Sequence, residues 1–441
     1  MPWKARRGKG RSMSAAKSAA LGIHWLVILP TAFVLAAAGA LRAKMDLPSD
    51  LKTYNPPGFY VLHSDVPRPM LQQIWLRMNF AAGAYQRRLH AIFGGAVTAK
   101  QPFYIFKSYP EYYAAGGWPG SAGEFRVGYS GQRLMAMAGQ KITHQVWHII
   151  QHEGFHQFTF AFLGRMLPPW ANEGTAEYFG EGLFTGNSFV TGWIPPYREK
   201  LIQWEIRHHK FLSIHKMRLM PYSQWNDVLM GTNYDEAWSM IYFLAWANHH
   251  KYAGPFTRYL RMFQQGVSSS LAWARVFGTN DADFEKLWKR YWLSLPPNAT
   301  AELYARVQTQ TLTNYLARAW SLNQKFKTAA DFLHAAADGT LKQYVLPNRY
   351  WLPPSLLARA LAQVPQVGTW TLTPTRVPRL ICTMSTGTKI IGIFHASRQW
   401  VGRVHVRVVR AAHHYSGHGD SQMNAAIKAL NANAYLDTVA Q

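Results

Sequence analysis

The sequence predicts an α+β protein: a domain over residues 58–297 with a small mixed sheet and a helical second half, then an α/β-containing basic C-terminal region. Three observations predict this class. Short runs of aromatic and β-branched residues come before residue 140, long stretches with helical spacing follow, and apolar–polar alternation returns near residue 404. With 441 residues and 48% hydrophobic content, the chain can bury two or three sizeable cores.

The N-terminal segment, residues 1–43, has the pattern of an export signal. A head containing six Lys and Arg residues and no acid precedes an apolar stretch from Ala19 to Leu41. Ala38-Gly39-Ala40 provides small residues for a signal peptidase, but the apolar stretch also approaches a membrane-spanning length. We therefore expect either a cleaved signal peptide or an uncleaved N-terminal anchor, with the rest of the protein exported, periplasmic or extracellular. Residues 44–57 are polar and Pro-rich and predict a linker.

Local patterns predict an order of elements along the chain. The expected elements are strands in "FYVLHSD" and "QPFYIFKS", a helix from Met70 to Phe93, a hairpin around Ser130-Gly131, a helix from Thr143 to Leu163, a second helix from near Asn172 to Gly180 or Gly182, helices up to about Trp292, a helical stretch from Ala301 to about Ala337, and β structure from Gly368 to Arg410. The stretch "LSLPPNAT" predicts a boundary near residue 298.

The charge balance is strongly positive, with 47 Lys and Arg against 22 Asp and Glu. Such a balance indicates contact with an anionic partner, but no nucleic-acid-binding motif accompanies it, so we expect no specific nucleic-acid binding. Two explanations of the positive charge remain open: the protein has a generally basic secreted surface, or it binds an anionic cell-envelope partner. Residues 301–441 hold 15 Lys and Arg and 5 Asp and Glu, which predicts a separate module that binds an anionic surface. The alternative is that this region packs on the preceding domain and completes its fold.

One short motif, "HEGFHQF", carries the pattern of a metal site. His152 and His156 are four residues apart, which places both side chains on one face of a helix. Glu153 lies beside the first histidine, where a carboxylate can take a proton from an activated water. Cys382 is the only cysteine, so the chain can form no intramolecular disulfide and a zinc site must use histidine and carboxylate ligands.

A third ligand is expected in "WANEGTAEYF". Glu173 follows His156 by enough residues to end one helix, turn, and begin a second helix packed on the first. Glu177 lies one turn further along the same face, where it can hold a ligand histidine in the required tautomer. The alternative is an amphipathic helix whose acids are solvated. His144 and His148 continue the spacing backwards, but each step of four residues turns around the helix, so we expect packing or surface roles for both.

These two motifs resemble the gluzincin branch of the zincin metallopeptidases, to which thermolysin and the aminopeptidase N group belong, and are most similar to bacterial peptidase MA-like domains. The resemblance covers residues 58–297 and implies a zincin-like catalytic domain. It implies His152, His156 and Glu173 as Zn²⁺ ligands and Glu153 as general base. Glu177 would be the outer partner of a ligand histidine.

The resemblance also extends to two features with less specific signals. Tyr234, in "TNYDEAWSM", resembles the tyrosine that stabilises the oxyanion in aminopeptidase-like members; the alternative is a plain aromatic helix start. The strand around Leu134–Ala138 is expected to pair with an extended peptide as a sheet edge. The Gly-Ala-Met-Glu-Asn motif of the aminopeptidase group is missing, which weakens any expectation of N-terminal trimming.

The sequence therefore predicts an exported or membrane-anchored zinc-dependent peptidase that acts on a peptide or protein substrate. The alternative is a non-catalytic protein that keeps the zincin scaffold and binds a cell-envelope partner. The presence of Glu153 favours the peptidase, because a scaffold without hydrolytic function has no evident need for a base beside the metal. No particular oligomeric state is predicted.

Overall fold

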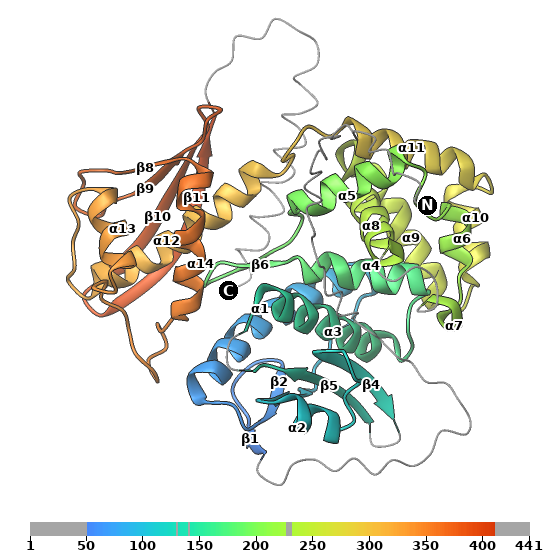
Figure 1. Ribbon diagram of the computed structural model, residues 1–441, viewed down its shortest axis with the longest axis horizontal. Coiled ribbons are helices and arrows are strands. Elements are labelled where there is room, and N and C mark those ends of the chain that lie inside the picture. Colours follow the sequence, from blue (N-terminus) through green and yellow to red (C-terminus); the bar gives the residue numbers. More distant parts are fainter. Residues whose placement is uncertain (1–50, 129–130, 140–141, 226–231, 411–441) are drawn as a thin grey trace, which may run out of the picture.

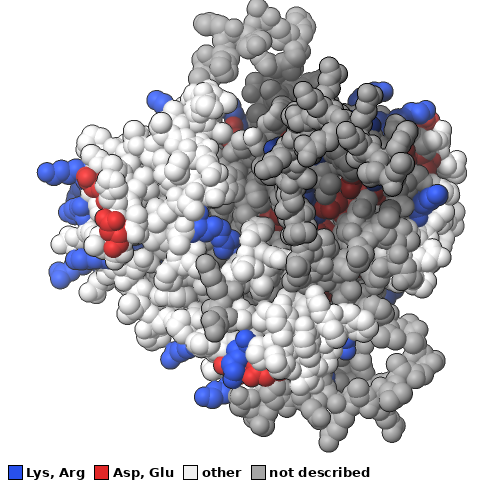
Figure 2. Space-filling view, viewed as in Figure 1, with Lys and Arg blue, Asp and Glu red and all other residues white. Residues whose placement is uncertain are grey.

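The computed structural model describes residues 51–128, 131–139, 142–225 and 232–410. Figure 1 shows three parts: a sheet with its covering helices at the bottom, a group of helices on the right, and the C-terminal region on the left. The expected signal peptide or anchor lies outside the described residues. Within the described ranges, no helix is long and apolar enough to cross a membrane. Basic side chains lie on all three parts of the face drawn in Figure 2.

The first sheet is mixed and has the strand order β1-β2-β3-β5-β4. Its strands are β1 (Lys52–Tyr54), β2 (Tyr60–Ser64), β3 (Gln101–Phe106), β4 (Gly123–Gly128) and β5 (Gly131–Met137). The pairs β2–β3 and β3–β5 are parallel, and the two outer pairs are antiparallel. Two expectations were wrong. Part of the segment expected to be a linker forms strand β1. The strand with Leu134, expected at the edge of the sheet, is β5 and lies inside it, because the other strand of the hairpin, β4, forms the edge.

Alternation along β5 gives the sheet two apolar faces. Leu134 and Ala136 face the main core under the long helices α1 (Arg68–Phe93) and α3 (His144–Leu163). Met135 and Met137 face a smaller cluster on the side of helix α2 (Tyr109–Ala114). Successive side chains of a strand point to opposite faces, so a strand covered on both sides is apolar throughout. The sheet thus holds helices α1 and α3 in fixed positions.

Helix α3 carries the histidine motif, and helix α4 (Pro169–Gly180) packs against it. The Thr143 side chain caps the start of α3 by accepting a hydrogen bond from Val146 N, and Gly164 ends the helix in the left-handed conformation. The sequence predicts the start of this second helix near Asn172. Instead α4 begins at Pro169, because proline is well suited to the first turn of a helix.

The remaining helices of the first domain surround α4. They are α5 (Pro196–Arg207), α6 (Ile214–Leu219), α7 (Tyr222–Trp225), α8 (Thr232–His250), α9 (Ala253–Gln264), α10 (Ser269–Phe277) and α11 (Asp281–Ser294). The predicted helical stretch up to Trp292 is confirmed. Helix α8 lies very close to α4, since a Cβ added at Gly174 would lie 2.4 Å from the carbonyl oxygen of Ala237. Glycine is required here by the close approach of the two backbones.

The C-terminal region is helical and then β, as predicted. It contains α12 (Ala301–Ser321), α13 (Ala329–Ala337), α14 (Pro354–Val367) and an antiparallel sheet of β8 (Thr369–Leu372), β9 (Leu380–Thr383), β10 (Lys389–Ser397) and β11 (Trp400–Val409). Helix α14 was not expected. Helix α12 packs on the sheet, and Gly392 of β10 leaves the space that Thr313 fills. The expected boundary at residue 298 falls between α11 and α12.

A hairpin of the first domain contacts the C-terminal region. Strands β6 (Leu183–Phe184) and β7 (Phe189–Val190) form it, and Figure 1 shows it extending between the two parts. Asn187 in its turn donates from Nδ2 to Val404 O at 2.9 Å and accepts from Gln310 Nε2 at 2.9 Å. Asn314 donates to Thr185 O at 3.1 Å. The C-terminal region therefore packs on the hairpin through polar contacts.

Candidate metal centre

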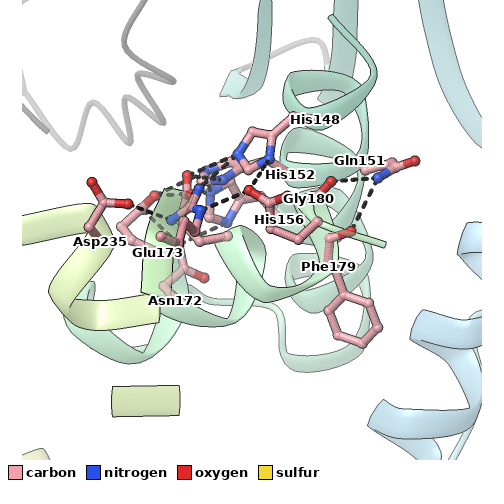
Figure 3. A network of polar contacts seen from close by, with 12 residues as sticks. His148, Gln151, His152, His156, Asn172, Glu173, Phe179, Gly180 and Asp235 are labelled. Carbon is pink, nitrogen blue, oxygen red and sulfur yellow. Dashed lines mark hydrogen bonds and ion pairs between the residues drawn. The ribbon is translucent and has the colours of Figure 1, made fainter. Parts of the chain in front are cut away.

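Helices α3 and α4 bring three predicted ligands together. The Nε2 atoms of His152 and His156 lie 2.9 Å apart, and each is 3.2 Å from Oε2 of Glu173. All three side chains are buried. The helical spacing of four residues places the two rings on one face of α3, and Glu173 reaches them from the facing turn of α4 (Figure 3).

The triangle of these three atoms has the size of a metal site. Nitrogen and oxygen ligands at about 2.0–2.1 Å from a tetrahedral zinc lie about 3.3 Å from one another. The observed separations of 2.9, 3.2 and 3.2 Å match this value within a few tenths of an ångström. Two imidazole nitrogens at 2.9 Å also need a proton or a cation between them, because their lone pairs would repel each other. His152, His156 and Glu173 therefore form a group that could hold a metal ion.

The opposite sides of the two imidazole rings are held by polar partners. His152 Nδ1 lies 3.0 Å from Oε1 of Glu177. The side-chain nitrogen of Asn172 lies 2.9 Å from His156 Nδ1 and donates to Glu173 Oε1 at 3.1 Å. Such partners fix the orientation of ligand rings. Asn172, directly before Glu173, was missed by the sequence analysis.

Glu177 belongs to a larger buried network that the sequence did not predict. Arg198 of α5 contacts the Glu177 carboxylate and donates to Glu181 at 2.8 Å and to Asp235 at 2.7 Å. His148 Nε2 lies 3.2 Å from Glu177 Oε2. The expectation for His148 was therefore wrong in one respect, since its ring joins this network and is half-buried, whereas His144 is exposed as expected.

His148, His152 and Glu177 form a second group with metal-binding geometry. The chemistry of this second group favours a role in positioning His152 rather than in holding a metal ion itself. Arg198 already neutralises Glu177, and His152 can present Nε2 to the first triangle while Nδ1 faces Glu177. The signal that could have revealed the network is the four-residue spacing of Glu173, Glu177 and Glu181, the last of which directly follows the end of α4.

The negative charges of the buried carboxylates favour the binding of positive charge at the site. Although burial opposes charge on His152, the adjacent carboxylates of Glu173 and Glu177 raise its pKa to about 10. Burial also acts against ionisation of Glu173, but His156 and His152 lower the pKa of that carboxyl to about 2. The site thus holds an anionic carboxylate and gains a proton to balance it. A divalent cation within the triangle would supply the same balance.

Glu153 has a different environment from Glu173. Its Oε2 accepts a hydrogen bond from the backbone N of Phe125 in edge strand β4 at 2.9 Å. Its Oε1 is buried and has no hydrogen-bond partner among the described residues. Burial raises the pKa of Glu153 to about 8. A carboxyl of this kind, with one oxygen held and one available, suits proton transfer near neutral pH.

Two tyrosines approach the triangle from the helical part. The Tyr234 ring, at the start of α8, lies with its centroid 6.4 Å from that of His152. Burial raises its pKa, and the charges of Glu173, Glu177 and Glu153 raise it further, so its hydroxyl stays protonated. Tyr222 of α7 donates to Leu167 O at 3.3 Å, and burial and Glu173 raise its pKa. Tyr234 is a candidate that the sequence predicts, whereas no motif in the sequence marks Tyr222.

Compared with known proteins, the sequence matches no family model and no curated protein.

Proposed function

We propose that this protein is a zinc-dependent peptidase, with His152, His156 and Glu173 as metal ligands. The observation that carries the proposal is the triangle of two imidazole nitrogens and one carboxylate oxygen, with sides of 2.9, 3.2 and 3.2 Å. Three protein ligands leave one tetrahedral position for water or substrate, which is the arrangement of catalytic rather than structural zinc. When bound, zinc would lower the pKa of a water molecule and polarise the substrate carbonyl.

Glu153 is the proposed general base. As water attacks the peptide carbonyl carbon, Glu153 Oε1 accepts the proton that the water loses. Glu153 then gives this proton to the leaving nitrogen as the C–N bond breaks, so the products are a carboxylate and an amine. The hydrogen bond from Phe125 N to Oε2 keeps the carboxyl in place during both transfers.

Edge strand β4 is the proposed binding strand for an extended peptide. It pairs with β5 on one side, and within the described residues no strand pairs with its other side. A peptide added there would run beside Glu153, because Phe125 of this strand contacts the base. Tyr234 would donate a hydrogen bond to the carbonyl oxygen as negative charge develops on it. The substrate class is therefore an extended peptide or protein segment.

Metal analysis combined with digestion of an unbiased peptide library tests the proposal. The purified full chain should contain stoichiometric zinc and cleave peptides, and a chelator should abolish cleavage until zinc is restored. Zinc without cleavage of any peptide would support the alternative, a metal-holding scaffold that binds a cell-envelope partner. A chain that binds no zinc would contradict both readings.

A further inference from the structure

The C-terminal region contains a basic cleft far along the chain from the metal triangle. Its volume is about 550 Å³, and its lining includes Ser321, Asn323, Lys325, Arg376, Arg398 and Gln399. The residues come from three segments: the end of α12 with the loop that follows, the β8–β9 connection, and the β10–β11 turn. The cleft is therefore made by the fold of this region alone.

Hydrogen bonds fix each of the three segments in place. The β10–β11 turn is tied to helix α12 by Gln399 N, which donates to Ser321 O at 3.0 Å. The loop with Lys325 is held by its neighbour Gln324, whose Nε2 donates to Thr340 O at 3.1 Å. Within the β8–β9 connection, Arg379 N donates to Thr373 Oγ1 at 2.9 Å. The backbones that carry the basic residues are thus preorganised, which lowers the cost of binding.

The cleft has three cations and no acid in its lining: Lys325, Arg376 and Arg398. None of them forms an ion pair or hydrogen bond with another described residue. Two acids of the same region are engaged elsewhere, because Glu302 pairs with Arg410 at 2.7 Å and Asp331 caps α13. The cations are therefore available to an external anion.

The end of α12 opposes this charge only weakly. A helix C-terminus carries about half a negative charge, against three full positive charges here. The last carbonyls of α12 are also occupied: those of Arg318, Ala319 and Trp320 accept from the following turn, and that of Ser321 accepts from Gln399. The net field in the cleft is therefore positive.

From this arrangement we infer that the cleft binds a phosphate group. Arginine and lysine together with the side-chain amides of Asn323 and Gln399 are donors that recognise phosphate oxygens. The volume of about 550 Å³ exceeds that of a bare phosphate, so the group to which the phosphate is attached has room as well. A lipid headgroup and free phosphate share this chemistry. The inference does not depend on the proposed peptidase function.

The test compares two double variants of the full chain with equal change in net charge. Arg376→Gln with Arg398→Gln removes two cations of the cleft. Arg403→Gln with Arg407→Gln removes two exposed cations of β11 that do not line it. This control is needed because basic side chains are spread over the face of the molecule drawn in Figure 2. Thermal unfolding verifies that both variants fold, and Lys325→Gln serves as an independent cleft variant.

Binding is measured by calorimetry with inorganic phosphate and by sedimentation with vesicles of phosphatidylcholine, with and without phosphatidylglycerol. The wild type should bind inorganic phosphate saturably, and the cleft variant should bind it about tenfold more weakly or worse, while the control changes little. Loss of sedimentation with phosphatidylglycerol vesicles in the cleft variant alone would identify a lipid headgroup as the source, and unchanged sedimentation would identify free phosphate. No saturable phosphate binding by the wild type, or equal weakening in both double variants, would overturn the inference.

Discussion

His156 tests the ligand set at the scale of single residues. His156→Ala removes one corner of the triangle and leaves two ligands, which are too few to hold zinc tightly. We expect stoichiometric zinc to be lost from this variant while the protein stays folded, as measured by metal analysis and circular dichroism. His144→Ala is the matched control, because His144 lies on the same helix but is exposed. Full zinc content in His156→Ala would refute the ligand assignment.

The two tyrosines can be separated by their effects on turnover. Tyr234→Phe should lower kcat about 100-fold with little change in KM, because a hydrogen bond to the developing oxyanion is strongest in the transition state. Tyr222→Phe should have a smaller effect, since its hydroxyl donates to the Leu167 carbonyl in this structure. The reverse order of effects would assign the oxyanion contact to Tyr222 instead.

The candidate ligands could be predicted from the sequence because they depend on local geometry. Two histidines four apart share a helix face whatever surrounds them, and Glu173 needs only a turn to reach them. The partners that arrive from other helices could not be predicted. Arg198 reaches Glu177 from α5, and Tyr222 approaches from α7, so both depend on tertiary packing.

Two acids are buried where helices α5 and α8 pack together, Glu205 of α5 and Glu236 of α8, and they make the stability of the fold depend on pH. Burial and the charge of Asp235 raise the pKa of Glu205 to about 8. Burial raises the pKa of Glu236 to about 9, and the charges of Glu205 and Asp235 contribute to this rise. A carboxyl group whose pKa is higher in the folded than in the unfolded protein stabilises the fold fully at pH values below its unfolded pKa of about 4.5. That contribution is lost as the pH rises towards 8–9.

Glu236→Gln should therefore make the protein more stable at alkaline pH. The neutral amide can still accept the hydrogen bond that Leu212 N gives to Glu236 Oε1 at 2.6 Å. We expect a gain on the order of 1–3 kcal/mol at pH 9 and little change at pH 5, measured by thermal unfolding of the metal-free protein across this range. Asp338→Asn, at an exposed position, is the control. A gain at pH 5 equal to that at pH 9 would contradict the titration account.

Helices and strands could be predicted where apolar residues recur with a regular period and capping residues mark the ends. The helix expected from Thr143 to Leu163 is α3, with Thr143 as its cap. The sheet order was not predictable, because a hairpin gives two adjacent strands without showing which one joins the sheet interior. Strand β5 was therefore taken as the edge, although β4 occupies it. The short strand β1 is exposed or half-buried and shows no apolar signal.

At the scale of the whole molecule, the C-terminal region joins the first domain through the β6–β7 hairpin. All candidate ligands and their partners precede residue 298, so a chain that ends at Asn298 should still bind zinc. It should unfold at lower temperature, because Asn187 loses its bonds to Val404 and Gln310. Asn187→Ala in the full chain isolates that contact. A truncated chain that is insoluble or lacks zinc would show that the region completes the catalytic fold.

Glu153→Gln separates peptide hydrolysis from metal binding, because it removes the proposed base while leaving every proposed ligand in place. The amide keeps the shape of the side chain and can still accept the hydrogen bond from Phe125 N. Zinc content and peptide hydrolysis should be measured on the same preparation. We expect unchanged zinc with hydrolysis reduced by several orders of magnitude. Unchanged zinc with hydrolysis close to that of the wild type would show that Glu153 is not the base.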